Sequence, residues 1–122
     1  MAQHNELGKM GEEAARLFLV RKNYKILYRN WRFEKYEVDI VAEDVDELVF
    51  IEVKTRTSAE WGNPQDAIGK QRVKRLVEAA HYFLQMQDCD KSVRFDIIGA
   101  IWNGQDFEIE HIEDAFLPPV NI

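Results

Sequence analysis

Apolar residues recur every three or four positions in two stretches of the chain, as they do on the buried face of an amphipathic helix. Residues 6–22 show this spacing, and Asn23 follows at a position that suits a helix C-terminus. Residues 70–87 show it again, directly after Gly69. The first stripe consists of Leu7, Met10, Ala14, Leu17 and Phe18, and the second of Val73, Leu76, Val77, Ala80, Phe83 and Leu84. We therefore predict two helices.

Five further segments are rich in β-branched and aromatic residues, which predicts strands. They cover residues 24–33, 36–44, 46–55, 93–102 and 105–112. Asn103-Gly104 joins the last two and is typical of a type I′ hairpin turn. Residues 59–66 are predicted to form a loop, and residues 113–122 an irregular tail because of two consecutive prolines. The order α-β-β-β-α-β-β predicts a single α/β domain over residues 1–122, with a mixed five-stranded sheet flanked by helices.

In the second and third predicted strands, one face is apolar throughout and the other changes from apolar to charged along its length. Strand side chains alternate between faces, and one face is apolar in both strands, which predicts that it packs in the core. This face comprises Val38, Ile40, Ala42, Val49, Ile51 and Val53. The opposite face is apolar near the turn and charged at its far end, where it carries Glu37, Asp39, Glu52 and Lys54. If the turn is centred on Val45-Asp46, Asp39 lies opposite Glu52 and Glu37 lies opposite Lys54.

Two carboxylates that face each other across a strand pair repel. Burying them beside a core destabilises the fold unless a cation lies between them, so the pattern favours a metal site. The alternative is a cross-strand ion-pair network without a metal. In that network Lys54 would balance Glu37, and Arg56 would balance Glu52.

Composition and charge narrow the class of protein. The chain has 122 residues, 46% of them hydrophobic, and no apolar run long enough to span a membrane. It shows no signal-peptide pattern and has a single cysteine, Cys89, so we expect a cytoplasmic protein without an internal disulfide. The net charge is −6, which excludes a bulk polyanion binder. Yet residues 37–52 hold seven acids and no base, whereas residues 54–75 hold six bases and two acids. This asymmetry suits a metal nuclease with a basic rim, and ordinary solvated surface is the alternative.

A series of motifs resembles a known family. "VDIV" followed by "FIEVKTR" is similar to the D-x(n)-E-x-K core of the restriction-endonuclease-like, or PD-(D/E)xK, nuclease superfamily. More specifically, the motifs between residues 7 and 112 follow the order of the YraN-type family of bacterial proteins, which is similar to archaeal Holliday-junction resolvases. They are "GKMGEEAA", "NWR", "EVDIVA", "LVFIEVKTR", the Pro64 segment, "KQRVKRL" and "RFDIIGA". Tyr36 departs from the family, which often has glycine there, and the superfamily's proline before Asp39 is also missing.

The resemblance implies a restriction-endonuclease-like α-β-β-β-α-β core and nucleic acid, most often DNA, as the substrate. It implies that Asp39, Glu52 and the Val53 carbonyl bind a metal ion. Lys54 would position or activate the attacking water or neutralise the phosphate, and Glu12 would join the site from the first helix. Carboxylate and carbonyl oxygens suit Mg²⁺ or Mn²⁺.

Several basic and polar residues are weaker candidates for nucleic-acid contacts. Lys70, Gln71 and Arg72 lie at the start of the second predicted helix, and Arg56 follows the D…ExK motif. Arg32 lies in a strand that alternates basic and aromatic residues, a pattern that can clamp nucleic acid. A solvated helix face is the alternative for Lys70, Gln71 and Arg72, and a core position of Trp31 is the alternative for the strand of Arg32.

Three functions are compatible with the sequence. The first is a metal-dependent nuclease acting on DNA, with branched or Holliday-junction-like DNA as one candidate substrate. The second is a nucleic-acid-binding module with little or no activity, and the third a non-enzymatic acidic interaction domain. One D…ExK site cuts one strand, so a homodimer is the expected active form, with a monomer as the alternative. We expect no membrane association.

Overall fold

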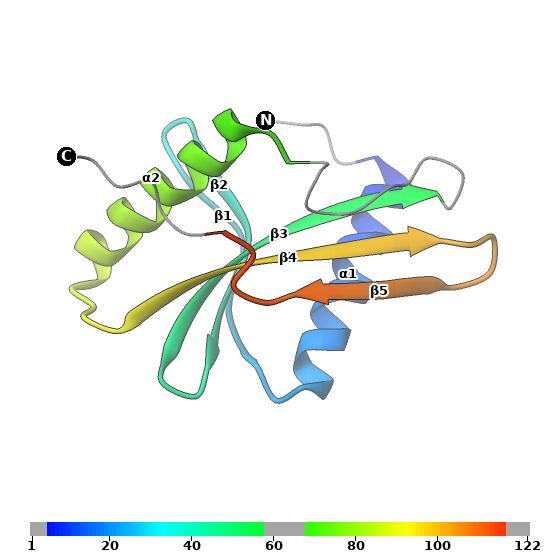
Figure 1. The fold of residues 1–122 in the computed structure, drawn as a ribbon, viewed down its shortest axis with the longest axis horizontal. Helices are drawn as coiled ribbons and strands as arrows, with labels where there is room; N and C mark the ends of the chain where they lie inside the picture. Colours follow the sequence, from blue (N-terminus) through cyan, green and yellow to red (C-terminus); the bar gives the residue numbers. More distant parts are fainter. Residues whose placement is uncertain (1–4, 58–67, 117–122) are drawn as a thin grey trace.

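The computed structural model describes residues 5–57 and 68–116. Its elements are α1 (Glu6–Arg21), β1 (Lys25–Phe33), β2 (Tyr36–Asp44), β3 (Glu47–Thr57), α2 (Lys70–Gln87), β4 (Ser92–Trp102) and β5 (Phe107–Ile112) (Figure 1). The seven predicted helices and strands are thus confirmed, with boundaries that differ by at most two residues. The loop predicted over 59–66 lies outside the described residues.

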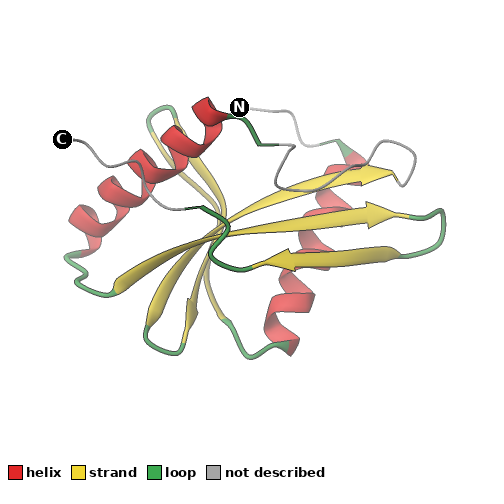
Figure 2. Ribbon diagram, in the orientation of Figure 1, coloured by secondary structure: helices red, strands yellow, loops and turns green. Residues whose placement is uncertain are grey.

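The five strands form one mixed sheet in the order β1-β2-β3-β4-β5 (Figure 2). β1, β2 and β3 form an antiparallel meander, and β4 and β5 form an antiparallel hairpin. β3 and β4 pair in parallel, so the chain must cross over between them, and α2 lies in this connection. The α/β class, the mixed sheet and the implied α-β-β-β-α-β order are confirmed.

The two helices cover opposite faces of the sheet and define two apolar clusters. Ala15 and Leu19 of α1 pack with Ile40, Val49 and Ile51. A second cluster contains Leu76, Ala79 and Phe83 of α2 together with Val41, Leu48, Phe50 and Phe95. β2, β3 and β4 are therefore buried on both sides, which explains why their sequences are almost continuously apolar.

The predicted face of Val38 is wrong. Ile40 and Ala42 do pack under α1, but Val38 packs with Val41 in the α2 cluster. The β2–β3 ladder ends at Ile40↔Ile51, so Val38 lies beyond the part of β2 that pairs with β3, and the alternation of Ile40 and Ala42 does not continue to it. The β1–β2 register is unchanged from Tyr28↔Val41 to Phe33↔Tyr36.

The predicted two-residue turn at Asn103-Gly104 is also wrong. Trp102 pairs with Phe107, so four residues form the loop. The Asn103 side chain shapes it, since its Oδ1 accepts hydrogen bonds from the Gln105 and Asp106 amides, each at 2.9 Å. Gly104 follows with a φ of 98°, in the region that glycine favours.

The part of the predicted irregular tail that the structure describes contains neither helix nor strand. The Ala115 amide donates to the Phe95 carbonyl at 2.7 Å, and Phe116 stacks on the Phe95 ring. The rest of the tail, 117–122, lies outside the described residues. No helix among the residues described is long and apolar enough to cross a membrane.

Candidate active site

Three carboxylates are buried where β2 and β3 separate. Glu37, Asp39 and Glu52 are 2%, 4% and 6% exposed. The β2–β3 ladder runs from Asp44↔Glu47 to Ile40↔Ile51, which confirms the predicted two-residue turn. Asp39 and Glu52 come next along the two strands, and their side chains interact. The Val53 amide donates to Asp39 Oδ2 at 2.8 Å, so the Asp39 side chain bridges the two strands.

Burial and neighbouring negative charges shift the pKa of Asp39. Burial raises its pKa well above the ordinary value, and the negative charge of Glu52 raises it further. The hydrogen bond from Val53 opposes this rise, whereas Glu12 adds to it from α1. Like charges have therefore been gathered at this point, and positive charge would stabilise them.

Close packing of α1 on β3 positions Glu12. Gly11 lies against Thr55, and a Cβ at Gly11 would lie 2.2 Å from Thr55 Oγ1. Only glycine allows such an approach. The next residue, Glu12, is half-buried on the side of the helix that interacts with Asp39. Glu13 is also partly buried and pairs with Arg16 and Arg29.

Arg72 of α2 occupies both carboxylate oxygens of Glu52. Its Nε donates to Oε2 at 2.9 Å and one terminal nitrogen donates to Oε1 at 2.8 Å, which is the bidentate geometry of a strong ion pair. The same terminal nitrogen donates to the Glu37 carbonyl at 2.9 Å. Burial alone would lower the pKa of Arg72, but the bonds and charge of Glu52 outweigh it and raise this pKa.

The carboxylates are ion-paired, but with other partners than the ones considered from sequence. Glu37 pairs with Arg32 at 2.9 Å, and Glu52 pairs with Arg72. Within residues 5–57 and 68–116, no hydrogen bond or ion pair holds Lys54, which is half-buried two residues beyond Glu52. The ammonium that the sequence marked as a catalytic candidate is therefore not engaged by these carboxylates.

Comparison with known proteins identifies the family. The model of "Uncharacterised protein family UPF0102" matches residues 11–100. UPF0102 proteins of Phocaeicola vulgatus and Bacteroides fragilis are each 48% identical over 120 residues, covering 98% of this chain and 99% of theirs. One from Flavobacterium psychrophilum is 46% identical over 116 residues, covering 95% and 98%.

The chain belongs to family UPF0102. This confirms the family resemblance of the sequence. The match begins at Gly11 and ends in β4, so it includes every candidate site residue from Glu12 to Arg72. It leaves out β5 and the tail.

The donor set of this UPF0102 protein suits a small hard cation in part. Two buried carboxylates, Asp39 and Glu52, lie side by side, and Mg²⁺ commonly uses one or two carboxylates together with waters and phosphate oxygens. A positive group, the Arg72 guanidinium, already lies on Glu52 as a cation would. Among the described residues, no group of three or more Asp, Glu, His or Cys side chains is arranged to hold a metal. The Val53 carbonyl therefore remains a predicted third ligand.

The remaining nucleic-acid candidates lie in different surroundings. Lys70 and Gln71 are exposed at the start of α2. Arg56 donates to the Thr55 carbonyl at 2.9 Å. Arg32 is largely exposed although it pairs with Glu37, whereas Arg72 points inward to Glu52. The structure thus brings Arg72 to the carboxylates, a contact that helical periodicity alone does not reveal.

A second charged cluster lies around Asp96 on β4. Arg94 donates to both Asp96 oxygens, at 2.9 and 3.0 Å. His111 Nε2 lies 2.7 Å from Asp96 Oδ2, and the Arg94 guanidinium also reaches Tyr24, Asp44 and Glu47. Burial raises the pKa of Tyr24 to about 12. The alternation of Arg94 and Asp96 on one strand face was the available signal, and His111 had none.

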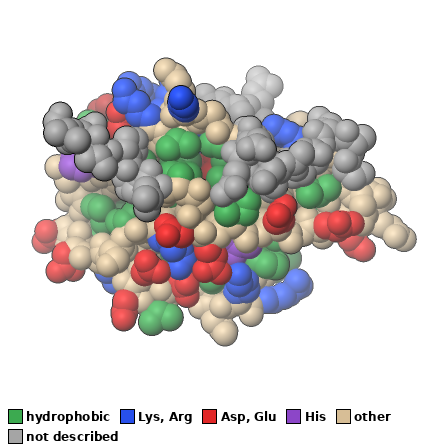
Figure 3. All heavy atoms as spheres, in the orientation of Figure 1, with side chains coloured by type: hydrophobic (Ala, Val, Ile, Leu, Met, Phe, Trp, Pro, Cys, Tyr) green, Lys and Arg blue, Asp and Glu red, His purple; other side chains and the backbone are tan. Residues whose placement is uncertain are grey.

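This second cluster lies in an acidic part of the surface. Figure 3 shows Asp and Glu side chains spread across the lower part of the visible face, with Lys and Arg among them. Asp44, Glu47 and Glu113 all lie within 4 Å of the Arg94 guanidinium. Their shared arginine explains how so many acids can lie together in this region.

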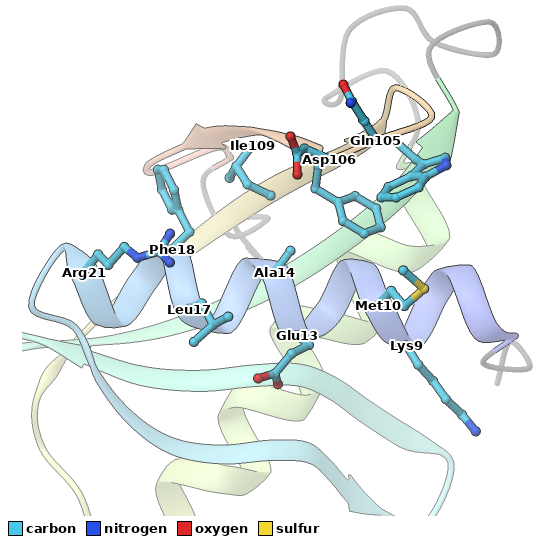
Figure 4. Close-up of a pocket in the computed structure, with 12 residues that line it drawn as sticks. Lys9, Met10, Glu13, Ala14, Leu17, Phe18, Arg21, Gln105, Asp106 and Ile109 are labelled. Carbon is cyan, nitrogen blue, oxygen red and sulfur yellow. The ribbon is translucent and has the colours of Figure 1, made fainter.

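A separate hollow of about 950 Å³ lies between α1 and the β4–β5 hairpin (Figure 4). Met10, Leu17 and Phe18 line it from the helix, and Phe107 and Ile109 line it from β5. Glu37, Asp39 and Glu52 are not among the described residues that line it. The hollow is therefore distinct from the candidate active site.

Proposed function

We propose that this UPF0102 protein is a metal-dependent nuclease that hydrolyses phosphodiester bonds in DNA. The observation that supports it most is the burial of Asp39 beside Glu52 on two rigid strands, with the pKa of Asp39 raised by burial and by its neighbour. A fold normally avoids placing two carboxylates together in its interior. Their position makes sense if the site is built to bind a cation.

Each residue of the candidate site would have a separate role in the proposed reaction. Asp39 and Glu52 would hold Mg²⁺ or Mn²⁺, which when bound supplies a Lewis acid and lowers the pKa of a bound water. Lys54, which these carboxylates leave unengaged, would bind the scissile phosphate or orient the attacking water. Glu12 would orient water from the α1 side. Lys70, Gln71 and Arg56 would contact the DNA backbone around the site.

One observation favours a second function, a nucleic-acid-binding module without catalysis. The bidentate Arg72 ion pair neutralises Glu52 without any metal. If the pair is permanent, the carboxylates are structural, and the exposed basic residues would serve binding alone. The two functions differ in whether a divalent cation binds and in whether DNA is cut.

Cleavage assays on defined substrates separate the two. Four-way junction, flap, single-stranded and duplex DNA would be incubated with Mg²⁺, Mn²⁺ or a chelator. We expect metal-dependent cleavage by the wild type, no cleavage by Glu52→Gln, and reduced cleavage with retained metal binding by Lys54→Ala. Glu110→Gln, which changes an exposed glutamate on β5, is the matched control and should cut normally. Tight DNA binding without cleavage of any substrate would replace the proposal with the binding module.

A further inference from the structure

Arg72 holds the carboxylate that a metal would need. Its three hydrogen bonds, two to Glu52 and one to the Glu37 carbonyl, use three of the five guanidinium N–H donors. The side chain is 19% exposed, so it lies at the boundary between the site and solvent. It therefore has a short path outward.

The start of α2 leaves room for this side chain to move. Arg72 lies in the first turn of the helix, directly after the exposed Lys70 and Gln71. The N-cap is Gly69, and no atom of the described residues 5–57 and 68–116 lies within 4 Å of where its Cβ would be. Gly69, Lys70 and Gln71 are all exposed. The long arginine side chain can turn outward without moving the core.

A divalent cation and Arg72 would compete for Glu52. Both are positive, and a cation bound by Asp39 and Glu52 would lie a few ångströms from the guanidinium. At that distance a unit positive charge weakens the affinity for a divalent cation by about tenfold or more. The Arg72 pair also compensates a buried charge that would otherwise destabilise the metal-free fold.

We propose that Arg72 occupies Glu52 until a divalent cation binds, and that the cation then displaces its guanidinium. This inference rests on the proposed metal-dependent function and concerns how the same site is regulated. The released guanidinium remains next to Lys70 and Gln71, where its planar donors suit a phosphate. Arg72 would thus be a competitor of the metal in the resting protein and a phosphate ligand in the loaded one.

Metal affinity without DNA provides the first test. Mn²⁺ binding would be measured by calorimetry for the wild type, for Arg72→Gln and for Arg75→Gln. Arg72→Gln removes the charge but keeps a hydrogen-bond donor of similar reach. Arg75→Gln removes the same charge from an exposed position one turn along α2. We expect Arg72→Gln to bind Mn²⁺ about tenfold tighter or more, and Arg75→Gln to stay within about twofold of the wild type. Metal-free Arg72→Gln should also melt at a lower temperature than the wild type and gain more from added Mn²⁺.

The second test uses the unmodified protein. The Nε–H of Arg72 should give a distinct signal in an NMR spectrum of the arginine side chains, protected from exchange by its bond to Glu52, and missing from Arg72→Gln. Mg²⁺ at a concentration that saturates the protein should shift this signal and accelerate its exchange with water. An unchanged, still protected signal would show that the pair survives metal binding, and would overturn the inference.

The outcomes also separate this inference from the proposed function. If wild type and Arg72→Gln bind Mn²⁺ equally, or the variant binds it more weakly, the competition is wrong while metal binding stands. If neither protein binds Mn²⁺ or cuts DNA, the metal-dependent function fails and the inference fails with it.

Discussion

Two buried clusters in this protein each combine carboxylates with an arginine, but the pKa of the aspartate is lowered in one and raised in the other. Asp96 accepts hydrogen bonds from Arg94, His111 and the Asp114 amide. Burial alone would raise the pKa of Asp96, but these bonds lower it. Asp39 is also buried, and its pKa is raised, because burial and the negative charge of Glu52 both favour the protonated form and outweigh the hydrogen bond from Val53.

The difference shows which cluster is complete. The Arg94–Asp96 cluster satisfies its carboxylate and ties β4 to β5 and to the end of β2, which is what a structural network does. In the other cluster Arg72 balances Glu52, but no described base forms an ion pair with Asp39, and a fold gains nothing from that imbalance in the absence of a ligand. Burial of a charged residue is thus no indicator of function by itself. An imbalance among buried charges is the more informative sign.

The largest expected effect follows from removing Asp96. Asp96→Ala leaves Arg94 and His111 buried without their shared partner, which should lower the free energy of unfolding by roughly 3–5 kcal/mol. Chemical denaturation at neutral pH measures it. A loss below about 1 kcal/mol would mean that the cluster is not the structural network that the comparison assumes.

Gly11→Ala should have the next largest effect, and it acts on the candidate active site. The added methyl group would collide with Thr55 and push α1 away from β3, at a cost of about 1–3 kcal/mol. Glu12 would move with the helix, so we also expect weaker metal binding. Ala14→Ser, a small change on the same helix that faces the hollow, serves as the control for helix substitution. Normal stability of Gly11→Ala would contradict the close approach.

Asp39→Asn should behave in the opposite way to Asp96→Ala. The amide oxygen can still accept from Val53, and the repulsion with Glu52 disappears, so metal-free stability at neutral pH should rise by about 1 kcal/mol. Thermal unfolding with and without Mn²⁺ would show this gain together with the loss of metal-induced stabilisation. A substantial destabilisation would place Asp39 in the same class as Asp96.

The same variant tests the pH dependence. The folded protein retains the Asp39 proton to higher pH than the unfolded chain, whose carboxyl has the ordinary value of 3.8. Its stabilising contribution is therefore complete below that value and is lost as pH rises through the folded pKa. Between these pH values, the stability of the wild type relative to Asp39→Asn should fall by at most about 1.4 kcal/mol per pH unit. If the stability difference between wild type and Asp39→Asn does not change with pH, repulsion between Asp39 and Glu52 does not explain the effect of the variant.

Gly69→Ser should give the smallest effect. Gly69 has the extended conformation of an N-cap, and no atom of the part of the chain that the structure describes blocks a Cβ there, so a serine can accept from the first turn of α2. The gain should be about 0.5 kcal/mol, measured by thermal unfolding. Gly104→Ser, at a positive φ in the β4–β5 loop, is the contrasting control and should destabilise slightly. No gain from Gly69→Ser would indicate that the helix start is already held by other contacts.

Much of the candidate site follows from local sequence. The side chains of a strand alternate between its two faces, and a two-residue turn fixes which residues of the two strands face each other. The proximity of Asp39 and Glu52 can therefore be predicted from the sequence. What escaped prediction depends on longer-range or exceptional geometry. Val38 lies beyond the part of β2 that pairs with β3 and packs on the α2 side, and the Asn103 side chain turns an apparent two-residue turn into a four-residue loop.

The partners of the carboxylates could not be predicted for a different reason. Helical periodicity shows that Arg72 is at the start of α2, but how α2 crosses the sheet decides which carboxylate it meets. His111 likewise reaches Asp96 only because β5 pairs with β4 in one register. Contacts between distant segments depend on packing, and the pattern of one segment does not contain them.

The parallel pairing of β3 with β4 bears on the order in which the molecule assembles. β1, β2 and β3 are joined by tight turns and can pair soon after they leave the ribosome. β4 can join β3 only after residues 58–91 have been synthesised, so this non-local step is expected to be slower. In the nascent chain, Asp39 and Glu52 therefore approach each other before Arg72 exists to neutralise either of them. When α2 packs on the sheet, Arg72 supplies a positive charge for Glu52. The site on the early strands is therefore completed only after the late half of the chain has been made.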